Sequence, residues 1–216
     1  MRTLLKRLAH GTVRILEHIQ VFYIPSELPL KTKLSFLFGR YEIETSKYIR
    51  KNVRGGVAFD IGAHIGYYSR LLAPLVDTVY AFEPEPRNFA LLVKNTKKYR
   101  NIVPVNAAVS DIVGRQDFFI VKNSTFRHSL INEGDCESVT VDTTTLDAFV
   151  NKKGIRNVSF AKIDVEGHEK DVLVGMKEVI KNCHPLVIAE MPMNDTYTPV
   201  SAVIGRQGIL RNYIIV

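Results

Sequence analysis

The sequence contains few of the residues that build disulfide frameworks or membrane spans. Cys136 and Cys183 are its only cysteines, too few for a disulfide framework and without the spacing of metal ligands. Both are interpreted as reduced thiols, which favours a cytoplasmic protein. No apolar run approaches the roughly 18 residues of a transmembrane helix. The N-terminal leucines are interrupted by basic residues, so a secretory signal is not expected.

The remaining composition is that of a folded globular chain. Of the 216 residues, 46% are apolar and 24% are charged, close to the averages for soluble proteins. A chain of this length can bury roughly 70% of the surface of its unfolded state. A disordered or collagen-like chain is therefore excluded, and one domain with an appendage is predicted.

The positive charge is concentrated at the N-terminus. Residues 1–58 contain eleven Lys or Arg and four Asp or Glu, whereas residues 59–216 contain eighteen of each sign. Leu4, Leu8 and Ile19 can share one helical face opposite Arg2 and Arg14. Such a helix packs on the main domain or lies peripherally on an anionic membrane, and both interpretations stay open. We divide the chain into a basic helical extension, 1–54, and a main domain, 55–216.

From residue 57 onward, short apolar runs alternate with helix-spaced patterns. Strands are predicted at 57–61, 78–82, 102–109, 158–165 and 186–191, and helices at 66–76, 86–99, 144–151 and 168–181. A connector (21–33) and a helix (42–53) precede them, and a hairpin (116–121 with 137–141) interrupts them around a polar loop. Thr144 or Thr145 is the expected cap of the helix at 144–151. The alternation predicts an α/β fold, a Rossmann-like, doubly wound and mostly parallel sheet.

The C-terminal end looks short for such a sheet. Only 25 residues follow the last predicted strand, and residues 212–216 can supply one more. We therefore expect either a short sheet or a strand contributed by a second copy of the chain, which would make the protein a homo-oligomer.

A glycine loop follows the first predicted strand. It reads Asp60-Ile61-Gly62-Ala63-His64-Ile65-Gly66. Gly62 can make a tight turn with bare backbone, and Gly66 lets the next helix begin against a ligand. The loop lacks the glycine spacing of a dinucleotide site and the Lys-Ser/Thr of a P-loop. The acidic Asp60 would repel phosphate but suit a cation.

A single acid ends the second predicted strand. Glu83 lies about twenty residues beyond the loop, where a carboxylate can accept hydrogen bonds from both ribose hydroxyls of an adenosine cofactor. The alternative is a structural turn with a helix-capping acid. Since S-adenosylmethionine carries an ammonium and a sulfonium but no phosphate, it is the predicted cofactor.

Five blocks of this sequence together resemble the FkbM-type S-adenosylmethionine-dependent methyltransferases. They are Asp60–Tyr68, Ala81–Pro86, Asn106–Asp111, Val141–Leu146 and Lys162–Glu169, within roughly residues 40–192. The resemblance implies a class I methyltransferase fold and methyl transfer to a hydroxyl of a sugar, glycan or other small molecule. It also implies that Asp60, Gly62 and Gly66 border the methionine part of the cofactor. Ala63 and His64, within the same loop, are expected to line the cofactor. Glu83 would then hold the ribose, and Asn106 and Ala107 would lie near the adenine.

The acceptor hydroxyl needs a base, worth about 10²–10⁴-fold in rate. The candidates are Asp164, Glu166 and His168, which follow the fourth predicted strand of the parallel series; His128 in the mid-chain loop is a further one. Alternatively, His168 merely begins a helix. A Mg²⁺-assisted mechanism is also left open, with Asp164, Glu190 and Asn194 or Asp195 as oxygen ligands.

Two rival functions remain. An RNA methyltransferase would use the basic N-terminal arm, with a steep salt dependence. A nucleic acid is disfavoured, because the fourth-strand block lacks the Asn/Asp-Pro-Pro-Tyr/Phe element of base methylation and has no basic residues interleaved with aromatics. The other rival is a cofactor-binding protein without turnover.

Overall fold

The computed structural model describes residues 22–121, 128–130, 136–192, 200–207 and 210–215. The predicted N-terminal amphipathic helix, with its membrane interpretation, lies outside these residues. Within the described part of the chain, no helix combines the length and the apolar character that crossing a bilayer requires.

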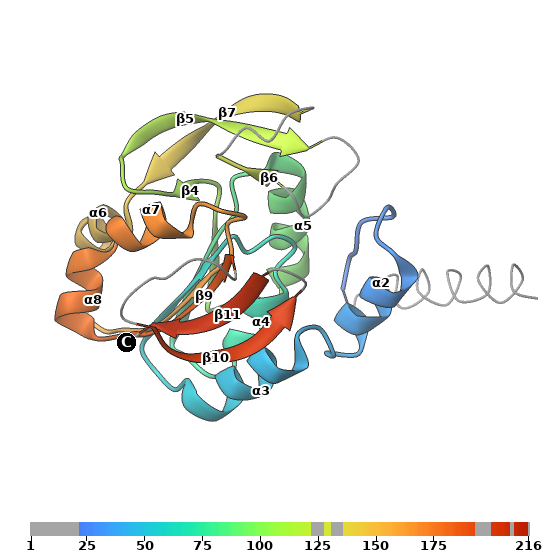
Figure 1. Cartoon of the computed structure of the whole chain (residues 1–216), viewed down its shortest axis with the longest axis horizontal. Coiled ribbons are helices and arrows are strands. Elements are labelled where there is room, and N and C mark those ends of the chain that lie inside the picture. Colours follow the sequence, from blue (N-terminus) through green and yellow to red (C-terminus); the bar gives the residue numbers. More distant parts are fainter. Residues whose placement is uncertain (1–21, 122–127, 131–135, 193–199, 208–209, 216) are drawn as a thin grey trace, which may run out of the picture.

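The main sheet has seven strands (Figure 1). In spatial order they are β10 (Val200–Gln207), β11 (Leu210–Ile215), β9 (Leu186–Pro192), β8 (Val158–Ile163), β1 (Val57–Ile61), β2 (Thr78–Phe82) and β3 (Ile102–Val105). The five strands from β9 to β3 are parallel, while β11 runs antiparallel to both of its neighbours. The predicted α/β class, with a mostly parallel sheet, is confirmed.

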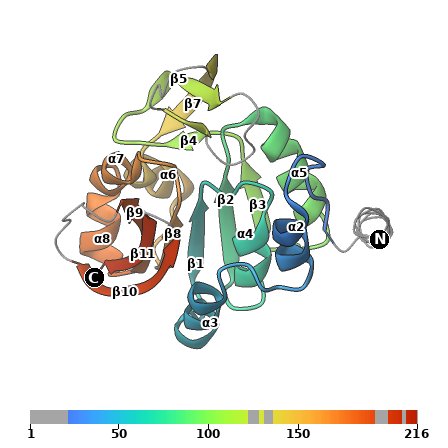
Figure 2. The same ribbon diagram turned by 45° about the vertical axis from the view of Figure 1, so that its right-hand side comes forward.

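Helices cover both faces of this sheet (Figure 2). They are α2 (Leu30–Leu37), α3 (Ile43–Asn52), α4 (Tyr67–Leu72), α5 (Pro86–Thr96), α6 (Leu146–Lys153), α7 (Glu169–Val174) and α8 (Lys177–Cys183). Successive strand residues face opposite sides. Phe59 and Ile61 therefore pack with α6, α7 and α8, whereas Ala58 packs with α3, α4 and α5.

A second sheet lies over the carboxyl ends of the parallel strands (Figure 1). Its order is β4 (Ala108–Val109), β7 (Cys136–Thr144), β5 (Gly114–Val121) and β6 (His128–Ser129). The β5–β7 pair is antiparallel, which confirms the predicted hairpin. The predicted strand 102–109 is wrong as one element, because it is divided between the two sheets. The side chain of Asn106 donates to the carbonyl oxygens of Glu83 and Pro84 at this bend.

The predicted helix 168–181 is also divided. The carbonyl of Gly175 accepts from the Asp147 amide at 3.0 Å instead of from the next turn of its own helix. The Asp147 carboxylate in turn accepts from the amides of Glu178 and Val179 at the start of α8. A Cβ at Gly175 would lie 2.0 Å from the Ser110 carbonyl oxygen, so only glycine permits this close approach.

Other predicted boundaries shift by a few residues. The predicted helix 66–76 ends at Leu72, because Pro74 lacks the N–H that would continue it. The predicted connector 21–33 is shorter, since α2 begins at Leu30. Thr145 caps α6 by accepting from the Ala148 amide.

The expectation of a short sheet, or of a strand from a second copy, was wrong. The chain itself supplies both β10 and β11 beyond β9. An antiparallel pair needs only a short connection, whereas a parallel pair requires a crossover of a dozen or more residues. The remaining length is therefore sufficient for two strands without a helix.

Candidate active site

A pocket of about 880 Å³, open to solvent, lies at the carboxyl ends of the main-sheet strands. Ligands of open α/β sheets bind at this edge. The predicted site residues in its wall are Gly62, Ala63, His64, Glu83, Ala107, Asp164, Glu166 and His168. The small sheet contributes Phe118, and Leu130 follows β6. The side chain of His128, the other base candidate, lies outside the described residues.

The glycine loop is held against the turn that follows β8. A Cβ at Gly62, where φ is +79°, would lie 1.8 Å from the carbonyl oxygen of Asp164. His64 also has a positive φ of 51°, a conformation that is uncommon outside glycine. Its amide points at Glu83 and donates to Oε2 at 2.8 Å. The loop therefore needs glycine at position 62 for close backbone approach.

Glu83 is a buried carboxylate at the pocket wall. Its Oε1 accepts from the Glu85 amide at 2.9 Å, and its Oε2 accepts from His64. Burial raises the pKa of Glu83 to about 8, although both amide bonds oppose the rise. Because a carboxylate has about four acceptor positions, Glu83 can still accept two hydroxyl donors.

Three of the residues predicted to bind the cofactor do not line the pocket but lie behind its wall. Asp60 is buried and accepts from the Ser69 hydroxyl; burial raises its pKa to about 6. A Cβ at Gly66 would meet Leu92 of α5, so this glycine permits helix packing. Asn106 holds the β2–α5 turn, as described above. Each of the three supports a segment that lines the pocket.

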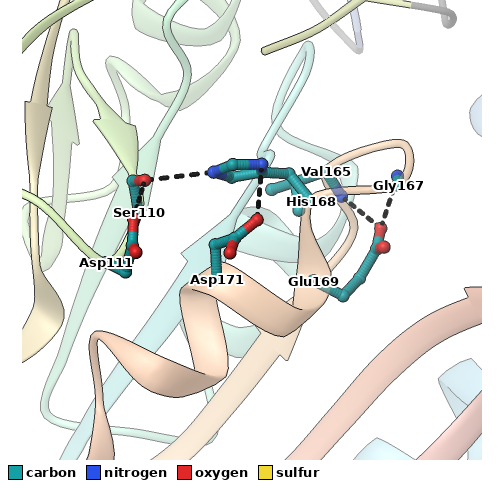
Figure 3. Close-up of polar contacts among 7 residues, drawn as sticks. All are labelled: Ser110, Asp111, Val165, Gly167, His168, Glu169 and Asp171. Atoms are coloured by element: carbon teal, nitrogen blue, oxygen red, sulfur yellow. Dashed lines mark hydrogen bonds and ion pairs between the residues drawn. The ribbon is translucent and has the colours of Figure 1, made fainter. Parts of the chain in front are cut away.

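The turn after β8 is the acidic side of the pocket. Glu166 and Gly167 both have positive φ, 52° and 100°. Glu169 closes the turn, since its Oε1 accepts from the amides of Val165 and Gly167 at 3.2 and 3.1 Å (Figure 3). Burial raises the pKa of Glu169. Sequence reasoning placed Glu169 only at a helix N-terminus and missed this bracing role.

His168 connects this turn to the small sheet (Figure 3). Its Nδ1 lies 2.9 Å from Asp171 Oδ2, and its Nε2 lies 3.0 Å from the hydroxyl of the buried Ser110. Ser110 also bonds to Asp111 at 3.1 Å. Both ring nitrogens are therefore engaged, which favours a structural link between β4 and α7 over a base.

A cluster of charged side chains, of which Lys162 and Glu190 are buried, lies around Asp164. Carboxylate oxygens of Glu42, Asp164 and Glu190 lie within 4.8 Å of one another. The fully buried Lys162 ammonium is 3.3 Å from Asp164 Oδ2. Asn194 and Asp195, the other predicted metal ligands, lie outside the described residues.

Residues before position 55 form one wall of the pocket. Phe36 and Tyr41 line it together with Tyr67 and Tyr68 of α4. The Phe36 and Tyr41 ring centroids are 4.5 Å apart, and those of Tyr41 and Tyr67 are 5.4 Å apart. Tyr67 also donates to the Tyr41 carbonyl at 3.1 Å. Sequence reasoning missed this wall, because it treated the N-terminal residues as an appendage.

Comparison with known proteins gives the family. Residues 60–202 match the model of the methyltransferase FkbM domain. The chain belongs to the FkbM methyltransferase family. The match covers the glycine loop, Glu83 and the turn after β8, whereas Phe36 and Tyr41 of the pocket wall precede it.

Two relatives support the assignment. The chain is 29% identical over 136 residues to the hexuronic acid methyltransferase AglP of Haloferax volcanii, covering 61% of this chain and 54% of that protein. It is 30% identical over 175 residues to the 31-O-demethyl-FK506 methyltransferase FkbM of Streptomyces tacrolimicus, covering 63% and 67%. This FkbM chain thus spans about half the length of the archaeal relative.

Solved structures show the same fold. A methyltransferase FkbM from Methylobacillus flagellatus KT superposes with a TM-score of 0.52 at 14% identity, over 94% of this chain and 58% of that one. The methyltransferase yhhF from Escherichia coli gives 0.51 at 11% identity, over 82% and 83%. The fold is that of the class I methyltransferases.

Proposed function

We propose that the protein is an S-adenosylmethionine-dependent methyltransferase that acts on a hydroxyl of a sugar, glycan or other small molecule. One observation carries this proposal beyond family membership. A single pocket joins the glycine loop and Glu83 to the acids of the turn after β8. It therefore offers a place for an adenosine cofactor beside a place for an acceptor.

The residues fit that cofactor. Glu83 has acceptor positions left for ribose hydroxyls, and the bare backbone at Gly62 and Ala63 leaves room for the methionine part. Ala107, Val109 and Phe118 offer apolar contact, as an adenine ring requires. The described pocket wall contains acids but neither Lys nor Arg, which suits a cationic cofactor and disfavours binding through phosphates. An RNA acceptor is accordingly not proposed.

When bound, the cofactor supplies an electrophilic methyl group on a sulfonium. The protein must align the acceptor oxygen with that group, and alignment can contribute about 7–11 kcal/mol. It must also accept the hydroxyl proton. We assign that role to Asp164, because it is an acid of the pocket wall, whereas both ring nitrogens of His168 are engaged by Asp171 and Ser110.

The aromatic wall suits a sugar acceptor. Phe36, Tyr41 and Tyr67 line the same pocket as the acids, the combination of aromatic contact and few polar groups that is typical of small-molecule sites. The hexuronic acid named for AglP and the 2-O-methylation named for NoeI, a 25% identical relative from Sinorhizobium fredii, support testing sugars first.

Mg²⁺ is not part of the proposal. The three clustered carboxylates have a spacing that a divalent cation could use, but the Lys162 ammonium already lies 3.3 Å from Asp164. Two cations so close would repel strongly in a buried site. We therefore propose that Lys162 supplies the positive charge there, and we expect methyl transfer to be insensitive to EDTA.

The test is a methyl-transfer assay. Purified protein is incubated with S-adenosylmethionine and a panel of glucose, rhamnose and glucuronic acid methyl glycosides, and S-adenosylhomocysteine formation is measured. We expect turnover with at least one sugar and a loss of about 10²–10⁴-fold in Asp164→Asn. Cofactor binding without turnover on any hydroxyl compound would favour the non-catalytic alternative.

A further inference from the structure

The turn after β8 is backed by a polar cluster that surrounds Asp164, the proposed base. Its members are Glu42 before α3, Tyr68 in α4, Lys162 in β8, Asp164 after β8 and Glu190 in β9. The Tyr68 hydroxyl donates to Glu42 Oε2. Of the three carboxylates, Asp164 is the one that reaches the pocket wall. Tyr68 also lines the pocket, whereas Glu42, Lys162 and Glu190 do not and therefore act on it through Asp164.

Lys162 is charged although it has no exposure to solvent. Its Nζ lies 3.3 Å from Asp164 Oδ2 and 5.3 Å from the centroid of the Tyr68 ring. The contact with Asp164 is an ion pair, since Nζ makes no well-formed hydrogen bond to any described residue. Burial alone would lower the pKa of Lys162, but the carboxylates of Asp164, Glu42 and Glu190 outweigh it and raise the pKa. A buried ammonium is retained only when it is paired, and Asp164 is its partner.

Glu190 approaches Asp164 from the neighbouring strand. It is 5% exposed, and one of its carboxylate oxygens lies within 4.8 Å of one of Asp164. Burial, followed by repulsion from Asp164, raises the pKa of Glu190 to about 9. The raised pKa favours the protonated form of Glu190 at neutral pH, which places an O–H donor beside the Asp164 carboxylate. Asp164 thus faces one ammonium and one neutral carboxyl group inside the protein.

We propose that Lys162 and Glu190 are positioning residues, which hold the Asp164 carboxylate charged and oriented at the pocket wall. This inference rests on the proposed function. In that reaction the acceptor oxygen forms its bond to the methyl carbon, the electrons of the carbon–sulfur bond stay on sulfur, and the hydroxyl proton passes to Asp164. Without Lys162, the cluster would hold three carboxylates and no cation, and would take up protons instead.

Other titratable groups also interact electrostatically with Asp164. They are Asp60 from β1, Glu42 before α3, Tyr68 from α4 and Glu169 from α7, besides Lys162 and Glu190. All except Lys162 are acids, so Lys162 is the one cation among these described neighbours. Its removal should therefore change the proton content of the whole cluster.

Calorimetric titration with S-adenosylmethionine tests this without any acceptor. Titrations at pH 7 in two buffers of different ionisation enthalpy give the number of protons exchanged on binding. Without the Lys162 ammonium, the cluster of Lys162→Met should hold more protons before binding, and the cationic cofactor should expel them. We therefore expect this variant to release up to one proton more than the wild type when the cofactor binds. The excess should be smaller with S-adenosylhomocysteine, which lacks the sulfonium charge. Glu83 contributes equally to both proteins and cancels in the difference.

Three variants complete the design, each checked for folding by circular dichroism. Lys162→Arg keeps the charge, and Glu190→Gln mimics the protonated acid, so both should exchange protons as the wild type does. Glu190→Leu removes the carboxyl group beside Asp164 and should change the number of protons exchanged on cofactor binding. This variant keeps the test decisive if Lys162→Met does not fold. Folded Lys162→Met or Glu190→Leu with the wild-type proton count and affinity would overturn the inference. Failure of the folded wild type to bind the cofactor would instead contradict the proposed function.

Discussion

The backbone amide of His64 donates to Oε2 of Glu83 at 2.8 Å, so the loop after β1 and the acid after β2 form one unit. The contact requires His64 to adopt a positive φ and Glu83 to be buried. The loop predicted to bind the methionine part of the cofactor and the acid predicted to bind its ribose are therefore joined by a direct hydrogen bond.

Cofactor affinity should depend on pH through Glu83. The pKa of Glu83 is about 8 in the free protein, and donor hydroxyls of a bound ribose would favour the carboxylate, so binding releases a proton. Affinity for S-adenosylmethionine should thus rise as pH increases from about 6 to 8, by at most about tenfold per pH unit. Calorimetry across this range measures it. Glu83→Gln should bind weakly with a flat profile, and an equal slope in that variant would assign the proton elsewhere.

The stability of the cofactor-free protein should decrease as pH rises. The pKa values of Asp60, Glu83 and Glu190 are raised to about 6, 8 and 9. A raised carboxyl pKa stabilises the folded state fully below the unfolded pKa, and this contribution is lost as pH rises to the folded value. The melting temperature should therefore fall between about pH 5 and 9. Glu190→Gln should flatten the upper part of that fall; an unchanged slope contradicts the assignment.

Gly62→Ala should destabilise the protein more than Gly154→Ala. Both glycines have positive φ, and a Cβ at Gly154 meets nothing within 4 Å, whereas one at Gly62 lies 1.8 Å from the Asp164 carbonyl. The conformational cost, about 1–2 kcal/mol, is common to both, so the difference of about 1–3 kcal/mol reports overpacking. Urea unfolding measures both variants. Equal losses would mean that the loop moves away from Asp164 without cost.

Ser110 and His168 should be energetically coupled. Their side chains lie 3.0 Å apart and link β4 to the start of α7. A double-mutant cycle with Ser110→Ala and His168→Ala should give a coupling of about 0.5–3 kcal/mol in unfolding free energy. If His168 acted as a base alone, the two stability losses would add, while His168→Ala would lose methyl transfer and Ser110→Ala would keep it.

Sequence reasoning located the strands of the parallel sheet well because local patterns determine them. Val57–Ile61 and Thr78–Phe82 are predicted and observed with the same bounds. It failed where distant segments decide the structure. Gly175 interrupts a helix because Ser110 and Asp147 approach it, and β10 with β11 completes the sheet by antiparallel pairing.

The site shows the same division between local and distant signals. The glycine loop, Glu83 and the acids after β8 are found from motif and position, and they line one pocket. The aromatic wall of Phe36 and Tyr41 depends on contacts between segments far apart in the chain, and so does the partnership of Glu42 and Glu190 with the Lys162–Asp164 ion pair. A lysine in a buried strand before Asp164 is the one signal in the sequence that could have indicated that partnership.

The most direct test of the account is titration of the wild type and Glu83→Ala with S-adenosylmethionine and S-adenosylhomocysteine, with folding verified for both. The account predicts binding of both compounds to the wild type and a loss of about 10–150-fold in Glu83→Ala, since bonds to a charged acceptor contribute about 1.5–3 kcal/mol. Well-folded wild-type protein that binds neither compound, with or without Mg²⁺, would contradict the central claim.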